Sequence, residues 1–240
     1  MFERFLTKAD AHRVRACCAA LRRHQVKEWA LTGSVARELR LIERGEHVAL
    51  RSLNDLDFAT TSFDTVPKTL GTTFLVRHVH PFDPPNKIIA QFVSSELALR
   101  VDVFRTHREV MNRANSVRTE FGAILTLSLD DLVAHATRLA LPLADRQLVP
   151  FKHVSDFLRL SKVANLASAE RAWPQHRRVG DPASFRKAVT LLRDVIPRSA
   201  DLLIRPTYSQ NGSEECCRCA AVDGLELANP NAILSILGYC

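Results

Sequence analysis

The hydrophobic pattern of the chain changes near residue 123, and this change constrains the fold more than any other feature of the sequence. Before it, short apolar runs typical of strands are mixed with two helical patterns, and after it the periodicity is helical. Strands are expected at residues 56–61, 74–79, 87–94 and 97–105, and helices at 8–26, 35–43, 129–141, 151–165, 167–173 and 184–196. We therefore predict an α+β domain over residues 1–122 and a mostly helical domain, ending in a cysteine-containing tail, over residues 123–240.

The charge of the chain favours an anionic ligand. Its 240 residues include 33 Lys and Arg against 26 Asp and Glu, a formal net charge of +7. This surplus suits a nucleotide or an RNA, although the basic side chains are scattered, as in many basic proteins without such a ligand. The longest apolar runs are too short to cross a bilayer, and charges interrupt the first 23 residues where a leader would be apolar. We expect a cytoplasmic protein with no membrane partner.

Two aspartates two residues apart are the first candidate site. Asp55 and Asp57 begin the predicted strand 56–61, where alternation puts both side chains on one face with Cα atoms roughly 6.6 Å apart. Two close anions repel unless a cation lies between them, and Mg²⁺ prefers carboxylates together with substrate phosphates. A solvated turn is the alternative interpretation of such a pair.

Two further features strengthen the metal hypothesis. Asp102 lies between Val101 and Val103 in an apolar strand, where an acid is unusual unless it faces outward. Gly33 and Ser34 separate the apolar run 29–32 from the helix that follows. Such a turn can bind phosphate through backbone amides and a hydroxyl, although most Gly-Ser pairs are simple turns.

In this order, the three motifs resemble the nucleotidyltransferase superfamily, which has the DNA-polymerase-β-like catalytic fold. The matching segments are 31–34, 55–58 and 101–103, and the gap between Ser34 and Asp55 is longer than the family's common spacing. The resemblance implies a mixed β-sheet flanked by helices. It also implies that Asp55, Asp57 and Asp102 hold two Mg²⁺ ions, while Gly33 and Ser34 bind the phosphates of an NTP. The reaction would move a nucleoside monophosphate to an acceptor hydroxyl on a small molecule, a tRNA or a protein, releasing pyrophosphate.

The second half resembles the abortive-infection (AbiEii-type) nucleotidyltransferases. There a helical segment carries a basic residue followed by an aspartate, as Lys152 and Asp156 do here. The resemblance implies that both residues help to bind the nucleotide, and it allows a toxin with an antitoxin partner. A plain i,i+4 ion pair on the helix surface is the alternative.

The C-terminal cysteines offer a different hypothesis. Cys216, Cys219 and Cys240 can hold a structural zinc ion, although one Cys-x-x-Cys pair is less than a zinc site normally needs, and free thiols or a redox role are alternatives. Two functions besides an enzyme therefore stay open. One is a non-catalytic nucleotide- or partner-binding module on the same fold, and the other is a zinc-stabilised nucleic-acid-binding protein.

Overall fold

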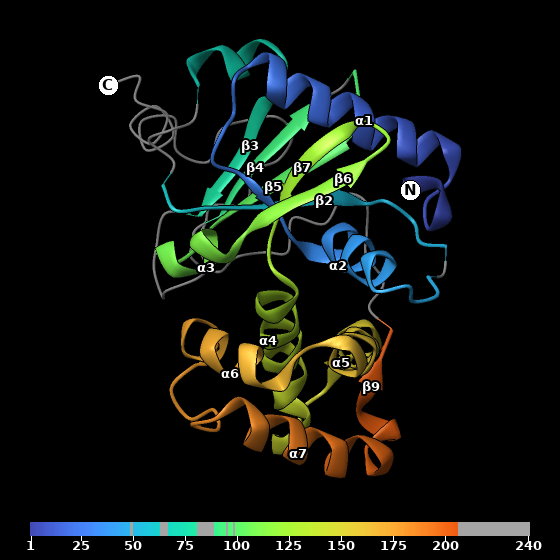
Figure 1. The fold of residues 1–240 in the computed structure, drawn as a ribbon, viewed down its shortest axis with the longest axis vertical. Helices are drawn as coiled ribbons and strands as arrows, with labels where there is room; N and C mark the ends of the chain where they lie inside the picture. The colour runs from blue at the N-terminus through green and yellow to red at the C-terminus, as the bar shows by residue number, and fades with distance from the viewer. Residues whose placement is uncertain (49, 63–66, 81–88, 95, 98, 206–240) are drawn as a thin grey trace.

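A seven-stranded mixed sheet forms the centre of the first half in the computed structural model, which describes residues 1–48, 50–62, 67–80, 89–94, 96–97 and 99–205 (Figure 1). The strands lie in the order β3-β4-β5-β2-β1-β7-β6. β2 runs parallel to β5 and β1 parallel to β7, whereas the other neighbours are antiparallel. The bounds are β1 Ala30–Leu31, β2 Asp55–Thr60, β3 Leu75–His80, β4 Ile89–Ser94, β5 Leu99–Arg105, β6 Asn115–Thr119 and β7 Gly122–Thr126.

Helices flank this sheet and make up most of the second half. α1 lies across the sheet, and α2 lies between the sheet and the C-terminal helices (Figure 1). The bounds are α1 Lys8–Arg23, α2 Gly33–Glu43, α3 Arg108–Arg113, α4 Leu129–Ala140, α5 Phe151–Val163, α6 Leu166–Ala172 and α7 Phe185–Val195. A small parallel pair, β8 Val149–Pro150 and β9 Leu203–Ile204, lies beside α5. The predicted α+β class, with a sheet flanked by helices and a helical second half, is confirmed.

Local sequence signals explain where several elements begin and end. Ser128 caps the start of α4, because its hydroxyl accepts a hydrogen bond from the amide of Asp131. α1 ends at Arg23 rather than at residue 26, since Gln25 takes a φ of 57° that a right-handed helix does not allow. Within the described ranges, every helix is too short or too polar to cross a membrane.

The hairpin of β6 and β7 and the short helix α3 were not expected from the sequence. β6 is an edge strand that buries one apolar side chain, Val117, so its sequence lacks the apolar alternation by which a strand is recognised. The predicted boundary between residues 122 and 123 falls inside the hairpin, and a division after Thr126 keeps the sheet whole. The two-domain organisation itself stays a proposal, and one cluster of buried apolar residues extends from Phe2 to Leu192.

A buried network of arginines and carboxylates joins α2 to α5. Glu38 on α2 is completely buried and pairs with Arg51 at 2.7 Å and with Arg159 of α5 at 2.6 Å. Asp156 of α5, 2% exposed, pairs with Arg37 of α2 at 2.6 Å and with Arg51 at 2.8 Å. Arg51, which precedes β2, therefore bridges two carboxylates from different helices. Each buried charge has a partner, as burial requires.

We expect Glu38→Gln to lower the free energy of unfolding by about 3 kcal/mol, because it leaves two arginines without their shared partner in a buried place. Urea unfolding followed by circular dichroism measures the loss. Glu43→Gln is the matched control on the same helix, since Glu43 is 35% exposed and pairs with Arg40 at 2.7 Å. It should cost less than about 1 kcal/mol. Equal losses in the two variants would contradict the importance of the network.

Candidate active site

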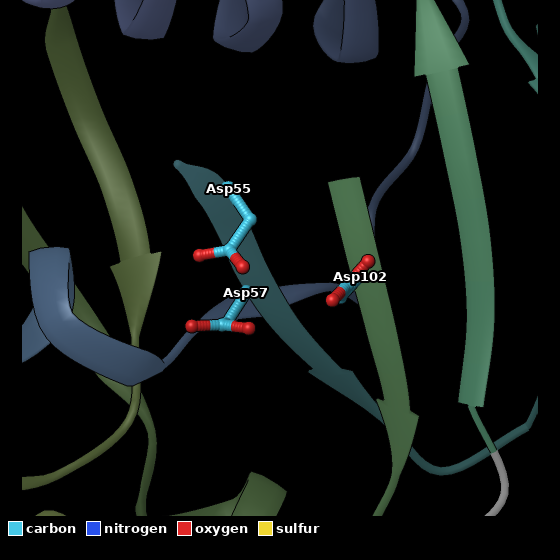
Figure 2. Close-up of side chains that lie close together, drawn as sticks. All are labelled: Asp55, Asp57 and Asp102. Carbon is cyan, nitrogen blue, oxygen red and sulfur yellow. The ribbon is translucent and has the colours of Figure 1, made fainter. Parts of the chain in front are cut away.

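Three carboxylates from two neighbouring strands meet on one face of the sheet. Asp55 and Asp57 lie on β2, and Asp102 lies on β5 directly opposite Asp57 in the parallel register. One carboxylate oxygen from each residue lies within 4.8 Å of the other two (Figure 2). Alternation along β2 puts Asp55 and Asp57 on one face, and pairing with β5 adds Asp102 to that face. The structure thus brings together all three predicted metal ligands, and we call them the carboxylate triad.

The predicted phosphate turn lies against this triad. Gly33 begins α2 with a φ of +65°, and a Cβ atom there would lie 1.8 Å from Oδ2 of Asp57. The amide of Thr32 also donates to the carbonyl of Asp57 at 2.8 Å. A glycine is required at this position both for its left-handed backbone and for the close approach of Asp57. Ser34, which is partly exposed, is the next residue of the helix.

Burial and the repulsion between like charges both oppose ionisation of the triad. Burial, followed by the charges of Asp55 and Asp102, raises the pKa of Asp57 to about 8, and Arg37 and Arg100 only partly oppose this rise. With all three carboxylates ionised, the site would carry more negative charge than its surroundings neutralise. A hard divalent cation would remove this cost, and carboxylate oxygens are the ligands that Mg²⁺ prefers. The donor set consequently fits a metal site.

Arg100 is a member of this site that the sequence analysis did not single out. It lies on β5 opposite Asp55, and its guanidinium donates to Oδ2 of Asp55. Its Nε lies 3.1 Å from Oδ1 of Asp102. The signal in the sequence is its spacing, because a residue two positions before Asp102 on a strand shares its face.

Arg37 is the second cation that the sequence analysis missed. It lies on α2 one turn after Gly33, is 6% exposed, and its charge acts on Asp57. Its Nη1 donates to Asp156, whereas its buried Nε has no hydrogen-bond partner among the described residues. The four-residue spacing from Gly33 on a helix could have indicated it.

The other predicted site residues have different positions. Asp156 is 2% exposed and accepts from Arg37 and Arg51. Burial opposes its ionisation, but these two arginines hold the pKa of Asp156 below its usual range. Lys152 is exposed in the first turn of α5. Asp156 therefore influences the triad through Arg37, which it binds and whose charge acts on Asp57.

The proposed zinc site is not tested. Its ligands Cys216, Cys219 and Cys240 lie outside the described residues, so structural zinc stays a prediction.

Comparison with known proteins gives a likeness in fold. No protein-family model and no curated protein matches the chain. A candidate nucleotidyltransferase from Thermotoga maritima is similar at 13% identity and a TM-score of 0.41, over 74% of this chain and 100% of that one. An antigenic nucleotidyltransferase-like protein from Paracoccidioides brasiliensis is similar at 12% identity and a TM-score of 0.44, over 81% of this chain and 94% of that one. A candidate nucleotidyltransferase from H. pylori reaches 10% identity and a TM-score of 0.35, over 83% and 100% of the two chains. Likenesses of this size assign no family, and the function proposed below depends on the geometry of the site.

We expect Gly33→Ala to destabilise the protein by more than the usual cost of a left-handed alanine, about 1 kcal/mol, because the added methyl displaces Asp57. Gly45→Ala is the matched control, since Gly45 has a φ of +76° and nothing within 4 Å of an added Cβ. Urea unfolding gives the loss of unfolding free energy in both variants, and the difference between the two losses is the cost of the contact with Asp57. Equal losses would show that Gly33 does not have to accommodate Asp57.

The raised pKa of Asp57 predicts an unusual pH dependence for the metal-free protein. An unfolded aspartate titrates near pH 4, whereas Asp57 in the fold titrates at about 8, so the folded state holds a proton that the unfolded chain has released. Stability should therefore fall as the pH rises from about 4 to about 8. Thermal unfolding in chelator across this range should show the fall in the wild type and a flatter profile in Asp57→Asn. Parallel profiles would contradict the assignment.

Proposed function

We propose that this protein is a metal-dependent nucleotidyltransferase that moves a nucleoside monophosphate from an NTP to an acceptor hydroxyl and releases pyrophosphate. The observation that carries the proposal is the carboxylate triad, with its ligand oxygens within 4.8 Å of one another, against a glycine turn at a helix N-terminus. Carboxylates bind divalent cations, and the helix start binds phosphate. Nucleotidyl transfer needs a site for divalent cations next to a site for phosphate.

The aspartates have two roles in this proposal. Asp55 and Asp57 would hold two divalent ions, and Asp102 would hold one of them and orient the acceptor hydroxyl. When bound, the ions supply charge stabilisation for the attacking and leaving oxygens and make the acceptor hydroxyl easier to deprotonate. Asp102 is 4% exposed, so bulk water has little access to its carboxylate.

The start of α2 binds the nucleotide. The amides of Gly33 and Ser34, with the Ser34 hydroxyl, donate to β- and γ-phosphate oxygens, and the dipole of this 11-residue helix favours the negative charge. Arg37 adds positive charge one turn further on, and Asp156 holds its guanidinium in place. Lys152 on α5 adds a mobile charge for the triphosphate. Asp156 is thus a positioning residue in this proposal.

The acceptor is open among a small molecule, a tRNA and a protein hydroxyl. The net charge of +7 agrees with an RNA acceptor and equally with the NTP itself. The likeness of the second half to abortive-infection nucleotidyltransferases adds a toxin, with an antitoxin as its partner, to this set of alternatives.

We expect Asp55→Asn and Asp57→Asn each to lower NTP turnover by at least about 100-fold, because either change removes a metal ligand. The assay follows release of pyrophosphate from each of the four NTPs with Mg²⁺ and candidate acceptors. Asp194→Asn, an exposed change on α7, is the control and should keep wild-type turnover.

Calorimetry separates the enzyme from the non-catalytic alternative. Binding of Mg²⁺·NTP that requires Asp57 but gives no transfer with any acceptor would favour a binding module on the same fold. Turnover at the wild-type rate in either aspartate variant would refute the proposed mechanism.

A further inference from the structure

A fourth charged residue, Arg100, shares the face of β2 and β5 that carries the carboxylate triad. Asp55 lies opposite Arg100 in the register, and Asp57 lies opposite Asp102, so four charged side chains share one face of two strands. The guanidinium of Arg100 contacts two of the three carboxylates, donating to Asp55 and lying 3.1 Å from Asp102. The proposed metal ligands therefore already share a cation that belongs to the protein.

The ion pair between Arg100 and Asp55 is more exposed than the pairs of the buried network. The side chain of Arg100 is 31% exposed and that of Asp55 is 26% exposed, so solvent reaches this pair. An ion pair with this exposure contributes little to stability. Stability alone therefore does not explain why β5 carries an arginine at this position. By contrast, Glu38 and Asp156 of the network are almost completely buried.

A divalent cation and this guanidinium compete for the same carboxylates. A carboxylate oxygen that accepts a hydrogen bond from Arg100 has less capacity to ligate a metal, and the positive charge of Arg100 repels an incoming cation. A guanidinium released from Asp55 and Asp102 can pair with a phosphate oxygen, for which its forked geometry is suited. An NTP entering with its metal would supply that oxygen.

We infer that Arg100 is the internal counter-ion of the carboxylate triad, which a divalent cation must displace, and that the displaced guanidinium pairs with a phosphate of the nucleotide. Metal and nucleotide then bind together, and metal alone binds weakly. This inference rests on the proposed function and adds to it a residue that couples the two ligands. Arg100 acts first on the carboxylates and then on the substrate, without forming or breaking a covalent bond.

The test measures metal and nucleotide affinity separately on the full chain. Mn²⁺ alone is titrated into wild type and Arg100→Met, and free Mn²⁺ is followed by electron paramagnetic resonance. We expect Arg100→Met to bind Mn²⁺ about tenfold more tightly, because a competing charge is gone. At saturating Mn²⁺, the same variant should bind ATP about tenfold more weakly, because a phosphate contact is gone.

If Arg100 had a merely structural role, its loss would not shift the affinities for Mn²⁺ and for ATP in opposite directions. Arg105→Met is the matched control, since Arg105 lies exposed on the opposite face of β5 and its loss changes the net charge equally. It should leave both affinities at wild-type values. Unchanged or weaker Mn²⁺ binding in Arg100→Met overturns the counter-ion role, and unchanged or tighter ATP binding overturns the phosphate contact.

Two additional variants keep the outcome decisive. If Arg100→Met does not fold, Arg100→Lys replaces it, because a lysine pairs with one carboxylate at a time and should give a smaller change of the same sign. Asp57→Asn tests the site itself. Loss of Mn²⁺ binding in Asp57→Asn with no change in Arg100→Met refutes this inference alone, whereas wild-type Mn²⁺ binding in Asp57→Asn refutes the metal site and the proposed function with it.

Discussion

Like charges held close together on two parallel strands are the constraint on which the rest of this structure depends. The register of β2 and β5 places Asp57 opposite Asp102, two residues away from Asp55, so three carboxylates occupy neighbouring positions on one face. The fold has to compensate for this repulsion. It does so with Arg100 from within the sheet, and with Arg37 from the helix that starts beside the triad.

The buried ion network extends this compensation into the helical half. Asp156 of α5 holds Arg37, and Arg51 joins Asp156 to Glu38 of α2. Consequently the position of the Arg37 guanidinium beside the site depends on α5, a helix of the second half of the chain. The stretch between α2 and β2, which is longer than in the family that the sequence resembles, supplies Arg51 and so helps to fix the two halves.

Local patterns were enough to predict most of the elements that carry the site. Helical periodicity, the Ser128 cap and the apolar runs of β2 and β5 depend on neighbours in the sequence, so they could be recognised in one dimension. The hairpin β6–β7 could not be recognised in this way. Its stability comes from pairing with β1 across the sheet, and the edge strand buries a single apolar residue. The predicted boundary between residues 122 and 123 falls inside this hairpin.

The sequence by itself determined that Asp55 and Asp57 share a face, that Gly33 and Ser34 lie between a strand and a helix, and that Asp102 is an acid in an apolar strand. These are consequences of chain periodicity. The tertiary structure was needed to show that Asp102 lies opposite Asp57, that Asp156 pairs with Arg37 and Arg51, and that Arg100 lies among the carboxylates. Such pairings depend on strand register and helix packing between residues far apart in the chain, which a local pattern does not encode.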